Sequence, residues 1–319
     1  MANIKRKIVL VGTGMVGMSF AYAALNQSIC DELVLVDLNI ERAKGEAMDL
    51  NHGLSFSSSS MKIYAGDYCD CTDADIVVIC AGVNQKPDET RLSLLQRNTK
   101  VFESIVPRVV SSGFDGIFLV ATNPVDIMTR VTYELSGFNA AKVIGTGTTL
   151  DTARLRYLLG DYFEVDPRNI HAYVIGEHGD SEFVPWSQAI LGVKPIYDML
   201  HDDSQRYKMD ELKKISNDVR TAAYEIIRAK GSTYYGIGMA ICKIVRAIFH
   251  NENSIYTTSV RLRGEYGLRK DVFIGNPCII NSGGANRILE LNLMSDELEK
   301  LKKSYEILDE SFQSISFSN

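Results

Sequence analysis

The chain has 319 residues, of which 45% are hydrophobic, and this is enough to bury a large core. It has 34 lysines and arginines and 40 aspartates and glutamates, which give a net charge of −6, and the sequence contains no block of basic residues. Nucleic acid and anionic membrane surfaces are therefore not expected as partners. No run of about 18 apolar residues is present, so we expect a cytoplasmic protein without a membrane span.

The first half of the chain alternates short apolar runs with helical patterns, which is typical of β-strands joined by helical crossovers in a parallel sheet. Several runs are apolar at consecutive positions, as expected for strands that helices cover on both faces. We expect six strands, at residues 7–12, 33–37, 61–65, 76–81, 117–121 and 143–145.

The second half has a different pattern, in which helices alternate with a few longer strands. We expect a helix from about residue 150, a strand at 170–175, helices across 210–229 and 233–250, and strands at 255–263 and 271–280. After Ser295, apolar residues spaced three or four apart predict a capped amphipathic helix. A mixed α+β substrate-binding domain over residues 147–319 is the simplest interpretation.

The six cysteines are scattered through strand-like and loop segments without the paired spacing of a zinc site or a redox dithiol. We interpret them as reduced structural thiols and expect no metal. They are Cys30, Cys69, Cys71, Cys80, Cys242 and Cys278.

A glycine-rich turn, Gly12-Thr13-Gly14-Met15-Val16-Gly17, directly follows the first strand and opens a helix. The glycines permit a tight turn, a close approach of the backbone to a pyrophosphate, and close packing of helix on strand. Asp37 ends the second strand twenty residues after Gly17, where a carboxylate binds an adenosine ribose and repels a 2′-phosphate. Residues 1–146 are thus predicted to form a Rossmann-type, doubly wound parallel sheet that binds NAD. A methyltransferase-type fold shares the turn and the acid, so the turn alone does not name the cofactor.

Four further segments carry a family resemblance. They are residues 84–91 (NQKPDETR), 123–126 (NPVD), 150–154 (LDTAR) and 176–180 (GEHGD). In this order they resemble the lactate and malate dehydrogenase family, and in particular its bacterial L-lactate dehydrogenases that respond to fructose 1,6-bisphosphate. The resemblance covers essentially the whole chain and implies the interconversion of pyruvate and L-lactate with NAD.

Reduction of a 2-keto acid requires a proton donor at the carbonyl oxygen and a clamp for the carboxylate. His178 is the expected donor, because imidazole titrates near neutrality and can also accept the proton in reverse. Asp151 is expected to orient the imidazolium. Arg154, three residues later on the same helix, offers a planar fork that matches a carboxylate.

The resemblance assigns roles to further residues. It places Arg91 on a loop that closes over the substrate, where a second guanidinium polarises the carbonyl and expels water. It places Asn123 against both substrate and nicotinamide. The full set of cofactor contacts that it implies is Gly12, Gly14, Val16, Gly17, Asp37, Arg42, Tyr68, Gly82, Asn123 and Thr146.

Substrate choice depends on Gln85, since malate-type relatives carry there an arginine that pairs with the second carboxylate of oxaloacetate. A neutral amide leaves that charge unpaired in a closed site, a penalty on the order of several kcal/mol. We therefore expect pyruvate, with Thr233 limiting the size of the substrate side chain. Asp88 departs from the glycine that is usual in bacterial relatives and adds charge near the loop hinge.

Arg156 and His171 resemble the positions at which bacterial relatives bind fructose 1,6-bisphosphate across a subunit interface. The resemblance thus implies a homotetramer and an allosteric activator whose binding His171 protonation would strengthen.

Three alternatives stay open at this point. The chain could be a malate dehydrogenase, or a broader L-2-hydroxy acid dehydrogenase. It could also be a non-catalytic NAD-binding regulator, because fold alone does not fix function.

Overall fold

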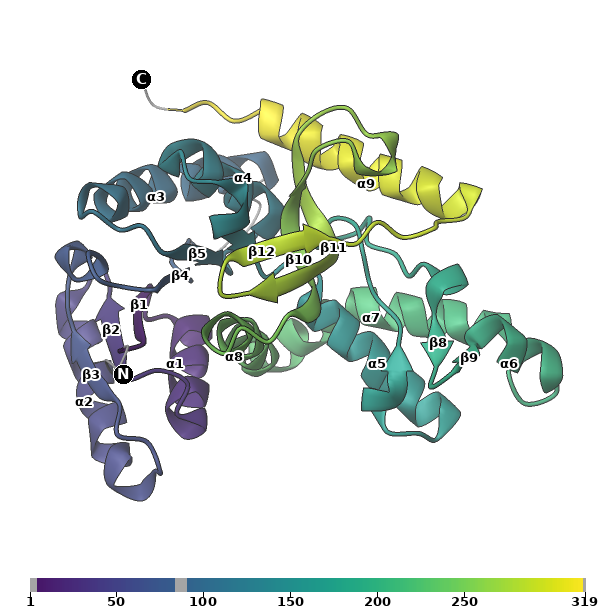
Figure 1. Ribbon diagram of the computed structural model, residues 1–319, viewed down its shortest axis with the longest axis horizontal. Helices are drawn as coiled ribbons and strands as arrows, with labels where there is room; N and C mark the ends of the chain where they lie inside the picture. The colour runs from purple at the N-terminus through teal and green to yellow at the C-terminus, as the bar shows by residue number, and fades with distance from the viewer. Residues whose placement is uncertain (1–4, 84–90, 318–319) are drawn as a thin grey trace.

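The computed structural model describes residues 5–83 and 91–317 (Figure 1). Within these ranges no helix combines the length and the apolar character needed to cross a membrane. Gln85 and Asp88 lie outside the described residues. Arg91 is the first residue of α3, but its side chain also lies outside the described part.

The first half forms the predicted parallel sheet, with strands in the order β3-β2-β1-β4-β5-β6. These strands span Lys7–Val11 (β1), Glu32–Val36 (β2), Lys62–Ala65 (β3), Ile76–Ile79 (β4), Ile117–Val120 (β5) and Val143–Gly145 (β6). The helices between them are α1 (Met15–Gln27), α2 (Ile40–Gly53), α3 (Arg91–Ser111) and α4 (Val125–Ser136). The order reverses direction between β1 and β4, so the doubly wound Rossmann-type prediction is confirmed.

The same sheet continues into the second half of the chain. β10 pairs antiparallel with β6 through Ser259 and Gly145, and β11 and β12 follow it at the edge. These strands are β10 (Ser254–Leu262), β11 (Val272–Asn281) and β12 (Gly284–Ile288). The hairpin partner β12 was not predicted, because its sequence Gly-Ala-Asn-Arg-Ile lacks an apolar run.

The remaining elements complete the second half of the chain, with α5, α6 and α7 together on one side of the molecule and α8 beside α1 (Figure 1). They are α5 (Thr149–Phe163), β7 (Ile170–His171), β8 (Ile190–Leu191), β9 (Lys194–Pro195), α6 (Ile196–Asp202), α7 (Met209–Lys230), α8 (Tyr235–Phe249) and α9 (Ser295–Gln313). The strand predicted at 170–175 was too long. Val174 instead donates its N–H to the Thr152 hydroxyl (2.9 Å) and accepts from the Thr148 hydroxyl (2.6 Å), so these side chains of the α5 region replace a neighbouring strand.

The sheet is buried on both faces, as its consecutive apolar residues predict. In β1, Ile8 and Leu10 pack with α1, α2 and α8, whereas Val9 and Val11 pack with α3, α4 and α9. Helices on both faces leave the carboxyl ends of the strands as the place where polar side chains can gather.

Candidate active site

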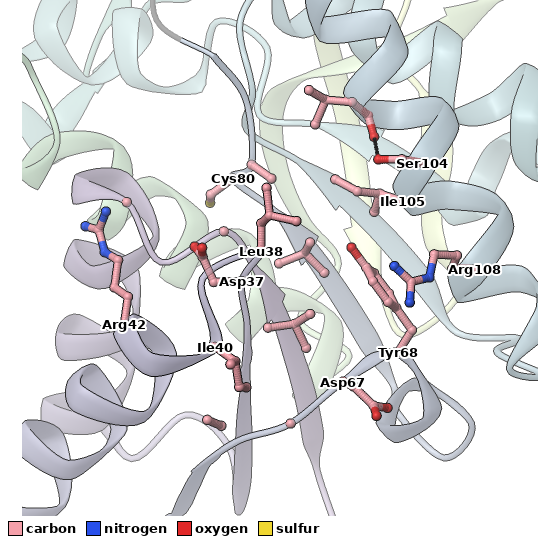
Figure 2. A pocket seen from close by; sticks show the side chains of 18 of the residues that line it. Asp37, Leu38, Ile40, Arg42, Asp67, Tyr68, Cys80, Ser104, Ile105 and Arg108 are labelled. Atoms are coloured by element: carbon pink, nitrogen blue, oxygen red, sulfur yellow. Dashed lines mark hydrogen bonds between the residues drawn. The ribbon is translucent and has the colours of Figure 1, made fainter. Parts of the chain in front are cut away.

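A cleft of about 960 Å³ opens at the carboxyl ends of β1, β2 and β4. Figure 2 shows Asp37 and Arg42 on one side of it and Tyr68 and Arg108 on the other, with the Arg108 guanidinium 4.5 Å from the centre of the Tyr68 ring. The expected cofactor residues that line the cleft are Gly12, Gly14, Asp37, Arg42, Tyr68 and Gly82. The cleft therefore lies where the strand order reverses, which is the usual ligand position in such sheets.

The other expected cofactor residues are placed differently. Val16 and Gly17 lie in the first turn of α1, Asn123 directly precedes the N-terminal region of α4, and Thr146 follows β6. None of these four is among the described residues that line the cleft. Asn123 is held from α3, because the buried Asn98 amide donates to its carbonyl (2.9 Å).

Asp37 has a second role that the sequence did not reveal. Its carboxylate accepts hydrogen bonds from the backbone N–H and the hydroxyl of Thr13 (2.8 and 2.9 Å) and from the backbone N–H of Asn39 (2.9 Å). Partial burial opposes ionisation, but these hydrogen bonds outweigh it and lower the pKa of Asp37. Asp37 is therefore ionised, and it fastens the glycine-rich turn to the end of β2.

The glycine-rich turn depends on backbone shape. Gly12 has a φ of +101°, and a Cβ atom there would lie 2.5 Å from the backbone nitrogen of Ala81. A Cβ atom on Gly17 would lie 2.1 Å from the carbonyl oxygen of Gly12. Gly14, by contrast, lines the cleft and would place a Cβ atom in open space.

These features fit a dinucleotide. No side chain caps the start of α1, so its first N–H groups are left for an anion, and helix N-termini favour negative charge. Gly14 leaves the backbone open for the approach of a pyrophosphate, and the ionised Asp37 suits a ribose hydroxyl. NAD would thus be held by the turn at residues 12–17 and by Asp37.

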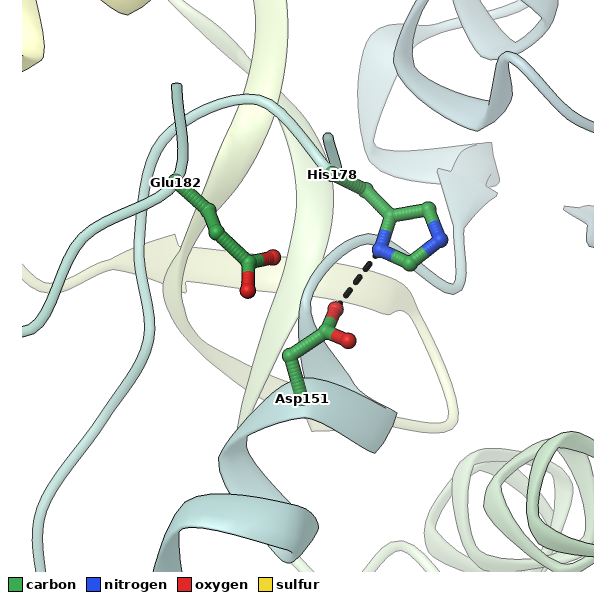
Figure 3. A group of neighbouring side chains, drawn as sticks. All are labelled: Asp151, His178 and Glu182. Atoms are coloured by element: carbon green, nitrogen blue, oxygen red, sulfur yellow. Dashed lines mark hydrogen bonds and ion pairs between the residues drawn. The ribbon is translucent and has the colours of Figure 1, made fainter. Parts of the chain in front are cut away.

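His178 and Asp151 form a close pair, with Asp151 in the first turn of α5. The Nδ1 atom of His178 lies 2.6 Å from Oδ2 of Asp151, and the Nη1 group of Arg154 donates to the other carboxylate oxygen (2.7 Å). The Asp151 side chain is 2% exposed, whereas that of His178 is 25% exposed. The other ring nitrogen of His178 points away from Asp151 (Figure 3). The structure therefore brings these three predicted residues together and leaves one imidazole nitrogen for a ligand.

The loop that carries His178 is held from three elements. Gly176 exchanges two backbone hydrogen bonds with Gly275 of β11 (2.9 and 3.0 Å), and the N–H of Glu177 donates to the Ser304 hydroxyl of α9 (2.6 Å). The N–H of His178 itself donates to the Asp126 carboxylate of α4 (2.7 Å). The backbone of His178 is thereby fixed before any ligand binds.

The charges of this cluster shift its protonation equilibria. Burial opposes the charged imidazolium, but the Asp151 carboxylate outweighs it and raises the pKa of His178 to about 9. Asp151 is almost fully buried, yet the charges of His178 and Arg154 lower its pKa. At neutral pH the pair is therefore an imidazolium bound to a carboxylate.

Three residues at this site were not predicted. Asp126 and Ser304 hold the loop, and Glu182 lies beside the pair (Figure 3). Asp126 lies in the quoted segment 123–126, and its place in the first turn of the helix that follows Pro124 was the signal for it. Ser304 had no signal, because only the fold brings α9 to residue 177.

The remaining predicted residues are Thr233, Arg156 and His171. Thr233 is half-buried in the connection between α7 and α8. Arg156 donates through Nε to the carbonyl of Ala172 (3.1 Å), and its guanidinium lies 5.0 Å from the Tyr173 ring centre. His171 is exposed on β7. Arg156 of α5 and His171 of β7 thus lie on adjoining segments, because Arg156 contacts the residue that follows His171.

Comparison with known protein families finds two matches that together cover almost the whole chain. Residues 6–145 match the NAD binding domain of lactate/malate dehydrogenase, and residues 148–316 match the lactate/malate dehydrogenase alpha/beta C-terminal domain.

Individual relatives agree with this. The chain is 53% identical over 305 residues to L-lactate dehydrogenase 2 of Bacillus cereus strain ATCC 14579, with 96% of each chain covered. It has the same identity and coverage with L-lactate dehydrogenase 2 of Bacillus anthracis. Among solved structures, it resembles MGS-M5, a lactate dehydrogenase from a Medee basin deep-sea metagenome library, with a TM-score of 0.95, 51% identity and coverage of 98% and 99% of the two chains. It also resembles the ligands-bound minor L-lactate dehydrogenase of Enterococcus mundtii, with a TM-score of 0.96, 44% identity and coverage of 99% and 100%.

Proposed function

The chain belongs to the lactate/malate dehydrogenase family, and from this premise we propose that it is an NAD-dependent L-lactate dehydrogenase. It interconverts pyruvate, NADH and a proton with L-lactate and NAD. One observation supports the proposed chemistry most directly. Nδ1 of His178 lies 2.6 Å from one carboxylate oxygen of Asp151, and Arg154 donates to the other.

His178 supplies the proton in this proposal. When bound, NADH supplies the hydride that adds to the carbonyl carbon of pyruvate. Because Asp151 engages Nδ1, the proton leaves from Nε2, and an O–H bond forms at the substrate oxygen as the N–H bond breaks. In lactate oxidation the neutral imidazole accepts that proton again. Asp151 fixes the ring orientation and stabilises the charged form.

Arginine side chains bind and polarise the substrate. Arg154, with its side chain 14% exposed, is proposed to bind the pyruvate carboxylate with the N–H groups that Asp151 does not use. Arg91, at the start of α3, is proposed to polarise the carbonyl, and Asn123 to contact substrate and nicotinamide. Val16 and Thr146 complete the proposed cofactor contacts.

Gln85 and Thr233 are proposed to select the substrate. A glutamine amide cannot neutralise the second carboxylate of oxaloacetate. An anion left unpaired in a closed site carries a penalty on the order of several kcal/mol. Initial rates of NADH oxidation with pyruvate and with oxaloacetate test this directly. We expect kcat/KM for pyruvate to exceed that for oxaloacetate by about 10²-fold or more. A preference for oxaloacetate would make the chain a malate dehydrogenase, and no turnover of either would favour a non-catalytic NAD-binding role.

We also propose that the chain forms a homotetramer. Large apolar side chains are exposed on α1, α2 and α8: Met15, Tyr22, Met48, Tyr235 and Met239. The Met239 sulfur lies 3.6 Å from the amide nitrogen of Gln27 in α1, so the exposed faces of α1 and α8 adjoin. Exposed apolar side chains on adjoining helices are typical of subunit interfaces. Sedimentation equilibrium should give four times the chain mass, whereas a monomer would refute the proposal.

Fructose 1,6-bisphosphate is proposed as an activator that binds at Arg156 and His171. Support comes from their adjoining positions on α5 and β7 and from the donation of Arg156 to Ala172, the neighbour of His171. Pyruvate saturation curves should shift to lower concentration when the sugar bisphosphate is added, and Arg156→Ala should abolish the shift. Arg168→Ala is the matched control, since Arg168 is exposed and paired with Asp166. Unchanged curves in the unsubstituted protein would refute activation.

We propose a boundary between an NAD-binding domain at 1–146 and a substrate-binding domain at 147–319. The end of β6 at Gly145 and the start of α5 at Thr149 support it. Because β10 pairs with β6 in one sheet, the two domains should unfold together. A single calorimetric transition is the expected result, and two separate transitions would contradict it.

A cytoplasmic location is proposed as well. Burial raises the pKa of Cys30, Cys71, Cys242 and Cys278 to about 12, so these side chains pack as neutral thiols. Thiols of this kind suit a reducing compartment. Cell fractionation should find the activity in the cytoplasm.

A further inference from the structure

Glu182 is a titratable side chain next to the reacting pair, and it has no role in the reaction described above. Ligand atoms of Asp151, His178 and Glu182 all lie within 4.8 Å of one another. Figure 3 shows the Glu182 carboxyl on the Nδ1 side of the imidazole, beside Asp151 and away from the nitrogen that faces the substrate. Its backbone is fixed by the loop that holds His178, because its N–H donates to the carbonyl of Gly179 (3.2 Å).

Glu182 also borders a second cavity, of about 690 Å³, which is separate from the dinucleotide cleft. Residues of α7 and α9 form its walls, and its charged lining includes Lys213, Arg220, Asp296, Lys300 and Lys303. A polar cavity of this size holds water, so Glu182 can exchange its proton with solvent from behind the His178–Asp151 pair.

Several charged groups face these two residues. Asp151, Arg154, His178 and Arg220 act on Glu182, and Asp126 acts on His178 from α4. Burial, and next the negative charge of Asp151, raise the pKa of Glu182 to about 8. Glu182 is therefore a neutral acid at pH 7, and above pH 8 it adds a second negative charge beside His178.

We propose that Glu182 is a positioning residue that extends to higher pH the range in which His178 keeps its proton. The proposal rests on the proposed function, since it concerns the proton that His178 gives to pyruvate. As the solution becomes alkaline, Glu182 releases its own proton to water in the cavity. The resulting carboxylate stabilises the imidazolium and so delays its deprotonation. Asp151 alone cannot respond in this way, because it is already ionised.

The substitution Glu182→Gln tests the proposal, because it keeps the shape of the side chain and removes its ability to ionise. In pyruvate reduction, kcat/KM should fall at alkaline pH as His178 loses its proton. We expect the pH at the midpoint of this fall to be lower by about one unit in the variant. Asp180→Asn is the matched control: it removes a carboxylate from the same loop, but Asp180 is exposed and bonded to Tyr224. Its profile should coincide with that of the unsubstituted protein. Superimposable profiles for Glu182→Gln and the unsubstituted protein would overturn the proposal.

A direct titration separates this inference from the proposed function. NMR of the protein with ¹³C-labelled histidine follows the five imidazoles, and the signal missing in His178→Asn identifies His178. Its titration midpoint should drop by about one pH unit in Glu182→Gln and recover in part in Glu182→Asp, which restores the charge. An equal midpoint in all three proteins would refute the role of Glu182, whether or not pyruvate is reduced. Failure of pyruvate reduction with a shifted midpoint would refute only the proposed function.

Discussion

The glycine-rich turn at residues 12–17 and the cluster around His178 are held in place by different forces. The turn depends on backbone shape, because Gly12 needs a positive φ and Gly17 packs against the Gly12 carbonyl. The cluster depends on buried charge, because Asp151 is 2% exposed and binds both His178 and Arg154. Substitutions in the turn should therefore act on packing and dinucleotide binding, whereas substitutions in the cluster should act on rate and pH dependence.

The largest effect is expected for His178→Asn. Loss of the proton donor should lower kcat for pyruvate reduction by about 10³-fold, the usual contribution of a positioned acid. NADH binding should be unaffected, because His178 is not among the described residues that line the dinucleotide cleft. Steady-state rates and NADH fluorescence titration measure the two effects. A variant that retains more than a tenth of the rate would contradict the assignment of His178.

A smaller loss of rate, about 10²-fold, is expected for Asp151→Asn, because the amide cannot stabilise the imidazolium. The charge of Asp151, with smaller contributions from Glu182 and Asp126, raises the pKa of His178 to about 9, above its ordinary value of 6.5. The ion pair thus stabilises the native state fully below pH 6.5, and this contribution is lost as the pH rises through 9.

Thermal unfolding of Asp151→Asn across the pH range checks this sign. The deficit in Tm relative to the unsubstituted protein should be largest near pH 6 and should narrow above pH 9. A deficit that stays constant over the whole range would show that Asp151 acts through packing or Arg154 rather than through the charge of His178.

The turn can be probed by a pair of alanine substitutions. Gly17→Ala should lower the free energy of unfolding by about 2–3 kcal/mol, because its Cβ would lie 2.1 Å from the Gly12 carbonyl oxygen. Gly14→Ala should leave stability nearly unchanged, since its Cβ meets open space, but should weaken NADH binding by about tenfold or more by keeping the pyrophosphate from the backbone. Urea unfolding and NADH titration measure both. Equal losses of stability in the two variants would contradict this division of roles.

The same division explains what the sequence could predict. The turn is a contiguous motif, so the strand before it and its glycines could be predicted from the sequence, as could Asp37 at the end of the next strand. The first six strands also lie within one or two residues of their predicted ends. The His178 loop is held by Asp126 of α4, Gly275 of β11 and Ser304 of α9. These residues come together only when the chain has folded.

The misses have similar causes. β7 ends early because hydroxyl groups of Thr148 and Thr152 take the hydrogen bonds of Val174, and no strand pattern encodes such a replacement. The attachment of β10 to β6 rests on a single register pair, Ser259 with Gly145, and strand order at a sheet edge is not written in local periodicity. The placement of Glu182 beside Asp151 likewise depends on tertiary structure. The family resemblance identified His178, Asp151 and Arg154, but it carried no information on Glu182.

The smallest expected effect, and the only gain, is at Asp126. Its Oδ2 atom accepts from the His178 N–H, while its buried Oδ1 atom has no hydrogen-bond partner within the described residues. Burial raises the pKa of Asp126 to about 6, well above its ordinary 3.8. For a carboxyl group, a raised pKa means that ionisation destabilises the native state: the penalty is absent below about pH 4, grows as the pH rises, and is complete above pH 6.

Asp126→Asn should remove this penalty while its amide oxygen still accepts from the His178 N–H. The variant should therefore gain about 1–2 kcal/mol of stability at pH 7 and nothing at pH 4. Differential scanning calorimetry at the two pH values measures this. A loss of stability at pH 7 would mean that the negative charge itself is needed to hold the His178 loop. Asp126 would then be a second buried carboxylate, after Asp151, whose charge holds the cluster, in contrast to the turn. A gain together with an unchanged rate would show that Asp126 holds the loop by hydrogen-bond geometry, and that charge matters only where it faces the imidazole.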